Sequence, residues 1–138
     1  MEGDLANTAR AYPETTMTAG PGAGAAGDDG CPIDLVHLAR QTFGERDLEA
    51  ELLRLFDRQS SQILARLMDG PTSDFRWRAD LAHTLKGSAR AVGAFGVAAA
   101  AEAYELDARV GADLAPAAAA LAEAIAAAHA AIADLLVG

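Results

Sequence analysis

Apolar residues in this chain recur at spacings of three and four, and no run alternates apolar and polar residues with the two-residue period of a strand. The β-branched and aromatic residues that strands favour are scarce, and aromatic residues make up only 5% of the chain. Hydrophobic residues make up 51%, but much of that share is alanine, the best helix former. The sequence therefore predicts an all-α fold.

Five helices are predicted, with glycine, proline and aspartate residues marking their ends. The predicted ranges are about 34–43, 47–68, 73–93, 95–110 and 116–136. The residues expected to cap or stop them are Asp34, Gly44, Gly70-Pro71, Ser73 or Asp74, Gly93 and Gly111. Short connections favour antiparallel neighbours. We therefore predict an antiparallel up-down four-helix bundle with a short additional N-terminal helix.

The chain divides into two parts by composition. Residues 1–31 are rich in Gly, Ala, Thr and Asp, and they contain too few large apolar side chains to offset the entropy of ordering them. We expect a flexible, disordered tail there. Residues 32–138 carry the helical pattern and are predicted to form the single domain.

Charge and composition exclude several classes of protein. The net charge of −9 argues against general nucleic-acid binding, because phosphate contacts need a basic face. The single Cys31 excludes an internal disulfide and a multi-cysteine zinc site. The N-terminus does not have the pattern of a signal peptide, and the most apolar run, 115–137, carries charged residues and is expected to be a packed helix that spans no membrane. We expect a cytoplasmic monomer, because one bundle can bury its own core.

The third predicted helix carries the residues that point to chemistry. His83, Lys86, Gly87 and Arg90 follow the spacing that places side chains on one helix face. The expected core residues lie on another side; they are Leu81, Leu85, Ala89 and Val92. A neutral imidazole is a usable nucleophile near neutral pH, and Lys86 supplies positive charge for phosphoryl oxygens. His83 is therefore a candidate phosphoacceptor on an outward-facing surface.

Gly87 is the most informative member of this face. Glycine within a helix costs about 1 kcal/mol relative to alanine, and this chain uses alanine freely. Its bare backbone leaves space beside His83 for a phosphoryl group and a partner protein.

Other polar residues have a structural interpretation of equal or greater weight. Arg90 is as easily a solvated charge as a phosphate-facing one, and Ala79 is placed by helix geometry on the docking surface around His83. Leu38 and Phe43 are weaker docking candidates, with core packing as the simpler interpretation. The remaining polar residues of note are expected at the solvated surface; they are His37, His129, Arg76, Arg78, Asp80, Glu102, Glu105 and Asp107.

The pattern His83-x-x-Lys86-Gly87, with Gly93 six residues later, resembles the signature of histidine-containing phosphotransfer (HPt) domains of two-component phosphorelays. The resemblance covers about residues 32–137. It includes three further segments: Pro32-Ile33-Asp34, the helix of Phe56, and Tyr104-Glu105.

This resemblance implies a role for each residue of the motif. His83 accepts the phosphoryl group through Nε2, Lys86 stabilises it, Gly87 gives clearance, and Gly93 ends the helix. The implied partners are response-regulator receiver domains and a hybrid histidine kinase. The resemblance further implies that the chain is a phosphoryl carrier with a phosphohistidine intermediate and no ATP-dependent kinase activity. It has no metal site or cofactor of its own, because Mg²⁺ is expected on the receiver.

Two alternatives to a phosphoryl shuttle stay open. A helical interaction module that binds a receiver without phosphochemistry needs the bundle but not His83. A phosphate sink needs the same site as a shuttle, and residue types do not separate the two.

Overall fold

The computed structural model describes residues 31–69 and 74–137, and within these ranges it contains five helices and no strand. The helices are α2 (Leu35–Thr42), α3 (Arg46–Asp69), α4 (Phe75–Val92), α5 (Phe95–Arg109) and α6 (Ala115–Val137). The predicted all-α class is confirmed, and the predicted ends agree to within about two residues. The expected tail, except Cys31, and the expected stop at Gly70-Pro71 lie outside the described residues.

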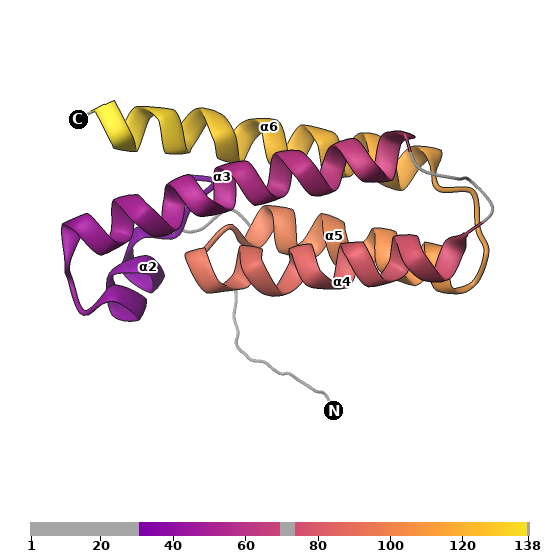
Figure 1. Cartoon of the computed structure of the whole chain (residues 1–138), viewed down its shortest axis with the longest axis horizontal. Coiled ribbons are helices and arrows are strands. Elements are labelled where there is room, and N and C mark those ends of the chain that lie inside the picture. The colour runs from indigo at the N-terminus through magenta and orange to yellow at the C-terminus, as the bar shows by residue number, and fades with distance from the viewer. Residues whose placement is uncertain (1–30, 70–73, 138) are drawn as a thin grey trace.

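The four long helices lie side by side along the long axis, and each reverses the direction of the one before it (Figure 1). α3 and α5 each contact both α4 and α6, whereas no close backbone contact links α3 with α5 or α4 with α6 in the described structure. The four helices thus form a closed ring around one core. The short helix α2 packs mainly against α3 and α4.

Local capping explains where α2 and α4 begin and where α2 ends. Asp34 and Asp74 each accept a hydrogen bond from the backbone N–H three residues later, at 3.1 and 3.0 Å. The expected end of α2 at Gly44 is wrong by one position, because Phe43 already adopts the left-handed conformation with φ 56°. Gly44 is also left-handed, and its N–H donates to the carbonyl of Ala39 at 2.9 Å.

The contact between α4 and α5 is built largely from alanine. The buried alanines are Ala79, Ala82 and Ala89 on α4, and Ala98, Ala101 and Ala108 on α5. Because the distance between two helix axes is set by the side chains between them, these small residues allow close approach. The polar side chains at the edge of this contact therefore reach across from one helix to the other.

Arg78 corrects the expectation of a surface side chain. It is only 4% exposed, and it donates hydrogen bonds to the carbonyl of Leu67 at the end of α3 and to the Tyr104 hydroxyl. The last carbonyls of a helix have no partner within that helix. The guanidinium of Arg78 supplies one for α3, which the sequence of α4 alone does not reveal.

Helix α6 is long and apolar enough to cross a membrane, judged by length and composition alone. The charged residues within 115–137 therefore do not by themselves exclude a membrane span by length and composition. In the described structure α6 packs along α3 and α5 through one stripe of side chains: Ala117, Leu121, Ile125, Ala128 and Ile132. This stripe agrees with the predicted packed helix.

Candidate functional site

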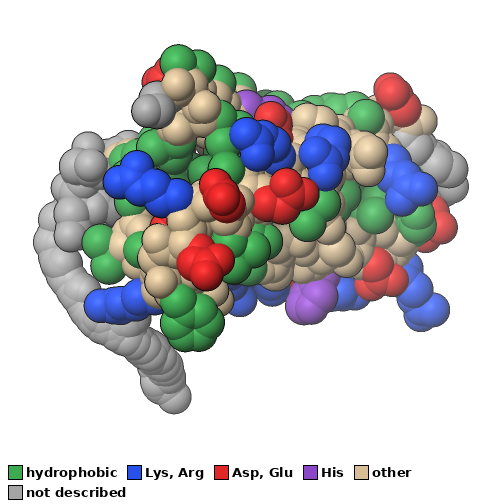
Figure 2. Space-filling model, turned by 60° about the vertical axis from the view of Figure 1, so that its left-hand side comes forward, with side chains coloured by type: hydrophobic (Ala, Val, Ile, Leu, Met, Phe, Trp, Pro, Cys, Tyr) green, Lys and Arg blue, Asp and Glu red, His purple; other side chains and the backbone are tan. Residues whose placement is uncertain are grey.

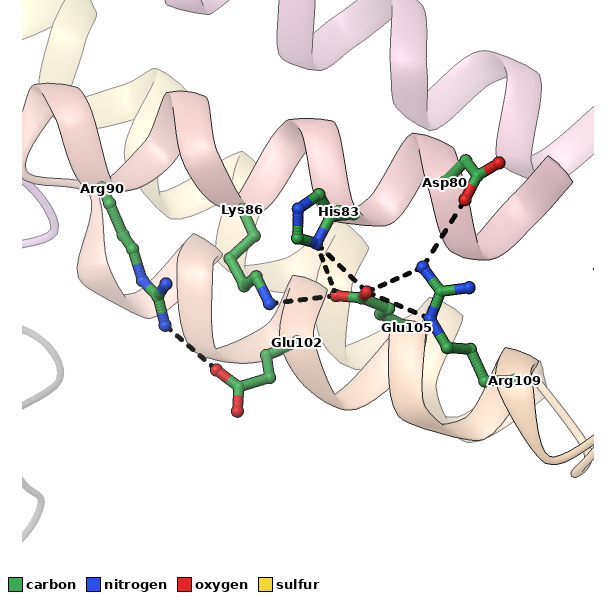
Figure 3. Close-up of polar contacts among 7 residues, drawn as sticks. All are labelled: Asp80, His83, Lys86, Arg90, Glu102, Glu105 and Arg109. Atoms are coloured by element: carbon green, nitrogen blue, oxygen red, sulfur yellow. Dashed lines mark hydrogen bonds and ion pairs between the residues drawn. The ribbon is translucent and has the colours of Figure 1, made fainter. Parts of the chain in front are cut away.

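His83 lies in the middle of α4 with 63% of its side chain exposed. Its Nδ1 atom is 3.1 and 3.3 Å from the two carboxylate oxygens of Glu105 on α5 (Figure 3). Nε2 has no hydrogen-bond partner among the described residues. The imidazole is thus fixed at one nitrogen and accessible from solvent, as the outward position predicted for His83 requires.

Glu105 contradicts the expectation of a solvated carboxylate. It is 8% exposed and it contacts three basic side chains: His83, Lys86 and Arg109. Burial alone would raise the pKa of this carboxyl, but the hydrogen bonds from Lys86 and Arg109 outweigh that effect and hold its pKa below the ordinary value. Glu105 is therefore an ionised carboxylate at the centre of the site.

Lys86 lies one turn after His83 and is 15% exposed. Its Nζ atom is 3.0 Å from Oε1 of Glu105, so the ammonium group lies beside the imidazole, as the spacing predicted. The Lys86 ammonium group therefore has a carboxylate counter-ion within the protein itself.

Arg109 completes the group from the next turn of α5. Its Nη2 and Nε atoms donate to Oε2 of Glu105 at 3.0 and 3.2 Å, and Nη2 also contacts Oδ1 of Asp80 on α4 at 3.5 Å. The hydrogen bond to Glu105 raises the pKa of Arg109 above its ordinary value. We call Asp80, His83, Lys86, Glu105 and Arg109 the Glu105 cluster.

The two weaker site candidates differ in outcome. Arg90 is exposed on the face of His83, but it pairs with Glu102 at 3.1 Å and does not contact the Glu105 cluster (Figure 3). Ala79 is fully buried, so its predicted place on the docking surface is wrong. It lies at the boundary with α5, where longer side chains reach solvent but a single methyl group is covered.

The two glycines of the motif have different surroundings. A methyl group added at Gly87 would meet no atom within 4 Å, which agrees with a bare, outward backbone. Gly93 ends α4 with φ 82°, and its carbonyl accepts a hydrogen bond from the Asp34 N–H at 2.8 Å. Gly93 thus links the end of α4 to the start of α2 and lies outside the Glu105 cluster.

The other two histidines are half-buried, not surface residues as expected. His129 Nε2 is 2.8 Å from Ser60 Oγ and 3.2 Å from Asp57 Oδ1, which ties α6 to α3. The ring of His37 packs edge-on against Phe95, and its buried Nε2 has no partner among the described residues. Neither histidine lies beside a lysine, so neither resembles His83.

The surface outside the cluster mixes charge and apolar groups. Leu38 is buried, which agrees with core packing, whereas Phe43 is 92% exposed at the end of α2. On the face shown in Figure 2, basic and acidic side chains are interspersed, with hydrophobic side chains between them. Within the described residues, no group of three or more His, Cys, Asp or Glu side chains is arranged to hold a metal ion.

The sequence does contain a pattern that indicates burial of Glu105. The buried stripe of α5 follows spacings of three and four through Val97, Ala101, Tyr104 and Ala108, and Glu105 falls within it. A carboxylate on a buried stripe needs a basic partner on the neighbouring helix. The acidic residues around it, Glu102 and Asp107, made this position look like part of a solvated face.

The cluster determines which nitrogen of His83 can react. An ionised carboxylate only accepts hydrogen bonds, so a neutral His83 ring donates to Glu105 from a protonated Nδ1. The lone pair of that ring is then on Nε2. The geometry can therefore support nucleophilic attack by Nε2 with a cation, Lys86, close by.

The lowered pKa of Glu105 gives a pH prediction. A glutamate carboxyl in an unfolded chain has a pKa of about 4.3. Because the folded-state value is lower, the stabilisation by Glu105 is complete above about pH 5 and is lost as the pH falls through the folded-state pKa. We expect the difference in unfolding free energy between wild type and Glu105→Gln, measured with urea, to shrink between pH 6 and pH 3.

The matched control is Glu102→Gln, which removes a half-exposed carboxylate from the neighbouring ion pair. Its difference from wild type is expected to be small and nearly constant with pH. A Glu105→Gln difference that stays constant over the same range would contradict the ion-pair account.

Comparison with known families gives a match that covers the four long helices. The family model described as Hpt domain matches residues 47–134, well over half of the chain, from the second residue of α3 to near the end of α6. α2 lies before the matched range. Neither the curated proteins nor the solved structures give a match.

Proposed function

The chain belongs to the Hpt domain family, and we propose that it accepts a phosphoryl group on His83 from an aspartyl phosphate of a receiver domain and passes it to another receiver. Hpt domains are phosphocarrier modules of two-component signalling, not kinases. The observation that supports the assignment to His83 is an exposed imidazole fixed through Nδ1 and flanked by Lys86. We interpret the ring of α3 to α6 as the up-down bundle that makes this site rigid, with α2 as an additional helix.

The proposed step forms one bond and breaks one. The lone pair of Nε2 attacks phosphorus, and the bond from phosphorus to the receiver's aspartyl oxygen breaks with its electron pair left on the carboxylate. The Nδ1 proton stays on the ring, which becomes an imidazolium. The carboxylate of Glu105, 3.1 Å from Nδ1, stabilises that positive charge. Transfer to a second receiver is the reverse of this step.

Each neighbour of His83 has a proposed part in the step. Lys86 carries positive charge that a short side-chain rotation brings to the phosphoryl oxygens. Gly87 leaves the backbone bare where the receiver's active-site loop approaches. Arg90, paired with Glu102 two turns from His83, is proposed to contact the receiver surface and not the phosphoryl group.

The partner supplies what the chain itself lacks in this proposal. A hybrid histidine kinase provides the phosphoryl group through its receiver, and Mg²⁺ is bound by receiver carboxylates. The chain then needs no cofactor, and it works as a cytoplasmic monomer.

A transfer assay with the wild-type protein tests the function. Receiver domains carrying labelled aspartyl phosphate are mixed with the protein, and the label on the chain is treated with acid and with alkali. Acid-labile, alkali-stable label that moves on to a second receiver is the expected result. Label that stays on the chain would indicate a phosphate sink. Receiver binding without any label would indicate an interaction module, and would refute the carrier function.

Gly87→Ala is expected to separate stability from function. The methyl group meets no atom within 4 Å, so the variant should gain up to about 1 kcal/mol of unfolding free energy from helix propensity. The same methyl group occupies the clearance beside His83, so phosphoryl transfer is expected to slow by about 10-fold or more. Urea denaturation and the transfer assay measure the two effects.

Gly96→Ala is the control, because Gly96 lies in α5 and a methyl group there also meets no atom within 4 Å. It should stabilise the protein without slowing transfer. Equal transfer rates for Gly87→Ala and Gly96→Ala would show that clearance at Gly87 is not needed.

A further inference from the structure

The Glu105 carboxylate is paired with two cations, Lys86 and Arg109. Oε1 is 3.0 Å from Nζ of Lys86, and Oε2 is 3.0 Å from Nη2 of Arg109. A carboxylate that is 8% exposed loses much of its hydration and depends on such partners to stay ionised. The two cations divide the two oxygens between them.

In the proposed transfer Lys86 also contacts the phosphoryl group, so it cannot stay paired with Glu105 throughout. The ammonium group that stabilises a phosphoryl group on Nε2 turns away from Glu105. Without another cation, the carboxylate would then be buried with only the imidazole as its partner. It would either hold Lys86 back or move away from Nδ1.

Arg109 can keep the Glu105 carboxylate paired when Lys86 turns away, because of how it contacts the carboxylate. It contacts Oε2 through two nitrogens, Nε and Nη2, and the planar guanidinium makes such paired contacts directional. Nη2 also contacts Asp80, which lies on α4 three residues before His83. Arg109 therefore connects Glu105 to the same helix that carries the histidine.

We propose that Arg109 is a positioning residue that holds the Glu105 carboxylate on Nδ1 of His83 while Lys86 moves to the phosphoryl group. The inference rests on the proposed function for the movement of Lys86, but the orientation of Glu105 exists in the unphosphorylated protein. Among the described residues, the charged groups that face the carboxylate all belong to the cluster: Lys86 and His83 from α4, and Arg109 from α5, with Asp80 behind Arg109.

The test compares Arg109→Gln with Arg109→Lys and with Arg90→Gln as a matched control. Arg90 also pairs with a glutamate across the α4–α5 contact, but it does not contact Glu105. Two quantities are measured: the share of the His83 ring protonated at Nδ1, from ¹⁵N NMR of the unphosphorylated protein, and the rate of labelling by a phosphorylated receiver.

In Arg109→Gln we expect a smaller Nδ1–H share and a transfer rate lower on the order of 10-fold, the usual size of losing a residue that orients a reacting group. Arg109→Lys keeps the charge but not the paired contact, so it should recover both quantities in part. Arg90→Gln should leave the Nδ1–H share unchanged, and any fall in its labelling rate measures the loss of one receiver-facing cation alone.

An Arg109→Gln variant with the Nδ1–H share and rate of Arg90→Gln would overturn the inference. So would a changed Nδ1–H share with an unchanged rate. If wild type is never labelled, the proposed function fails, and the NMR comparison still decides whether Arg109 orients Glu105 on His83.

Discussion

The His83→Gln variant is expected to take no label from any receiver that labels the wild-type protein. A glutamine amide nitrogen is not a nucleophile, because its lone pair is delocalised into the carbonyl group. The side chain is 63% exposed, so the substitution should leave the fold intact, as circular dichroism and a thermal melt can verify. The amide of glutamine can still donate to Glu105, which preserves the contact between α4 and α5.

The other two histidines provide controls of the same residue type. His129→Gln and His37→Gln change half-buried rings that lie outside the Glu105 cluster, so their labelling should match wild type after correction for any loss of folded protein. Label on His83→Gln, or its loss only in His129→Gln, would place the phosphoacceptor elsewhere.

Gly93→Ala is expected to have the largest effect on stability. The residue has φ 82°, where an L side chain costs about 1–2 kcal/mol. The added Cβ would also lie 2.7 Å from the backbone oxygen of Asp34, so the start of α2 must shift. Crowding of this kind typically adds about 1–3 kcal/mol. We expect a loss of about 3 kcal/mol in unfolding free energy, measured with urea.

Gly111→Ala separates the two contributions to that loss. Gly111 is also left-handed, with φ 71°, but a methyl group there meets no atom within 4 Å. The control should therefore lose only the cost of the backbone conformation, about 1–2 kcal/mol. Equal losses at the two positions would show that the contact between Gly93 and Asp34 does not contribute.

Most helix ends could be predicted from sequence because their signals are local. Asp34 and Asp74 cap the helices that follow them, and Gly93 ends the helix before it, as expected. Phe43 shows the limit of this reasoning. Its left-handed conformation is uncommon for a bulky residue, so the glycine after it looked like the natural end of α2.

The predictable part of the site lies on one helix. The spacing of His83, Lys86 and Gly87 within α4 fixes their common face, and the structure agrees with it. Glu105 and Arg109 come from α5, so their place depends on how α4 and α5 pair. These helices form an antiparallel hairpin around Gly93-Ala94, and Glu105 lies about as far after this turn as His83 lies before it. That relation becomes useful only once the hairpin is known.

Burial was hardest to predict for long charged side chains. Arg78 and Glu105 lie in sequences rich in charge, yet neighbouring helices cover both. In each case a partner on another element satisfies the charged group: a carbonyl at the end of α3 for Arg78, and Lys86 and Arg109 for Glu105. Such partners are set by tertiary packing, not by the local pattern.

The position of the phosphoryl group on the wild-type protein tests the central claim most directly. Protein with ¹⁵N-labelled histidine is phosphorylated by a receiver, and NMR identifies the nitrogen coupled to phosphorus. Because Nδ1 of His83 is engaged by Glu105, the account predicts phosphorus on Nε2 of His83. Phosphorus on Nδ1 of His83, or on any other residue, would contradict it.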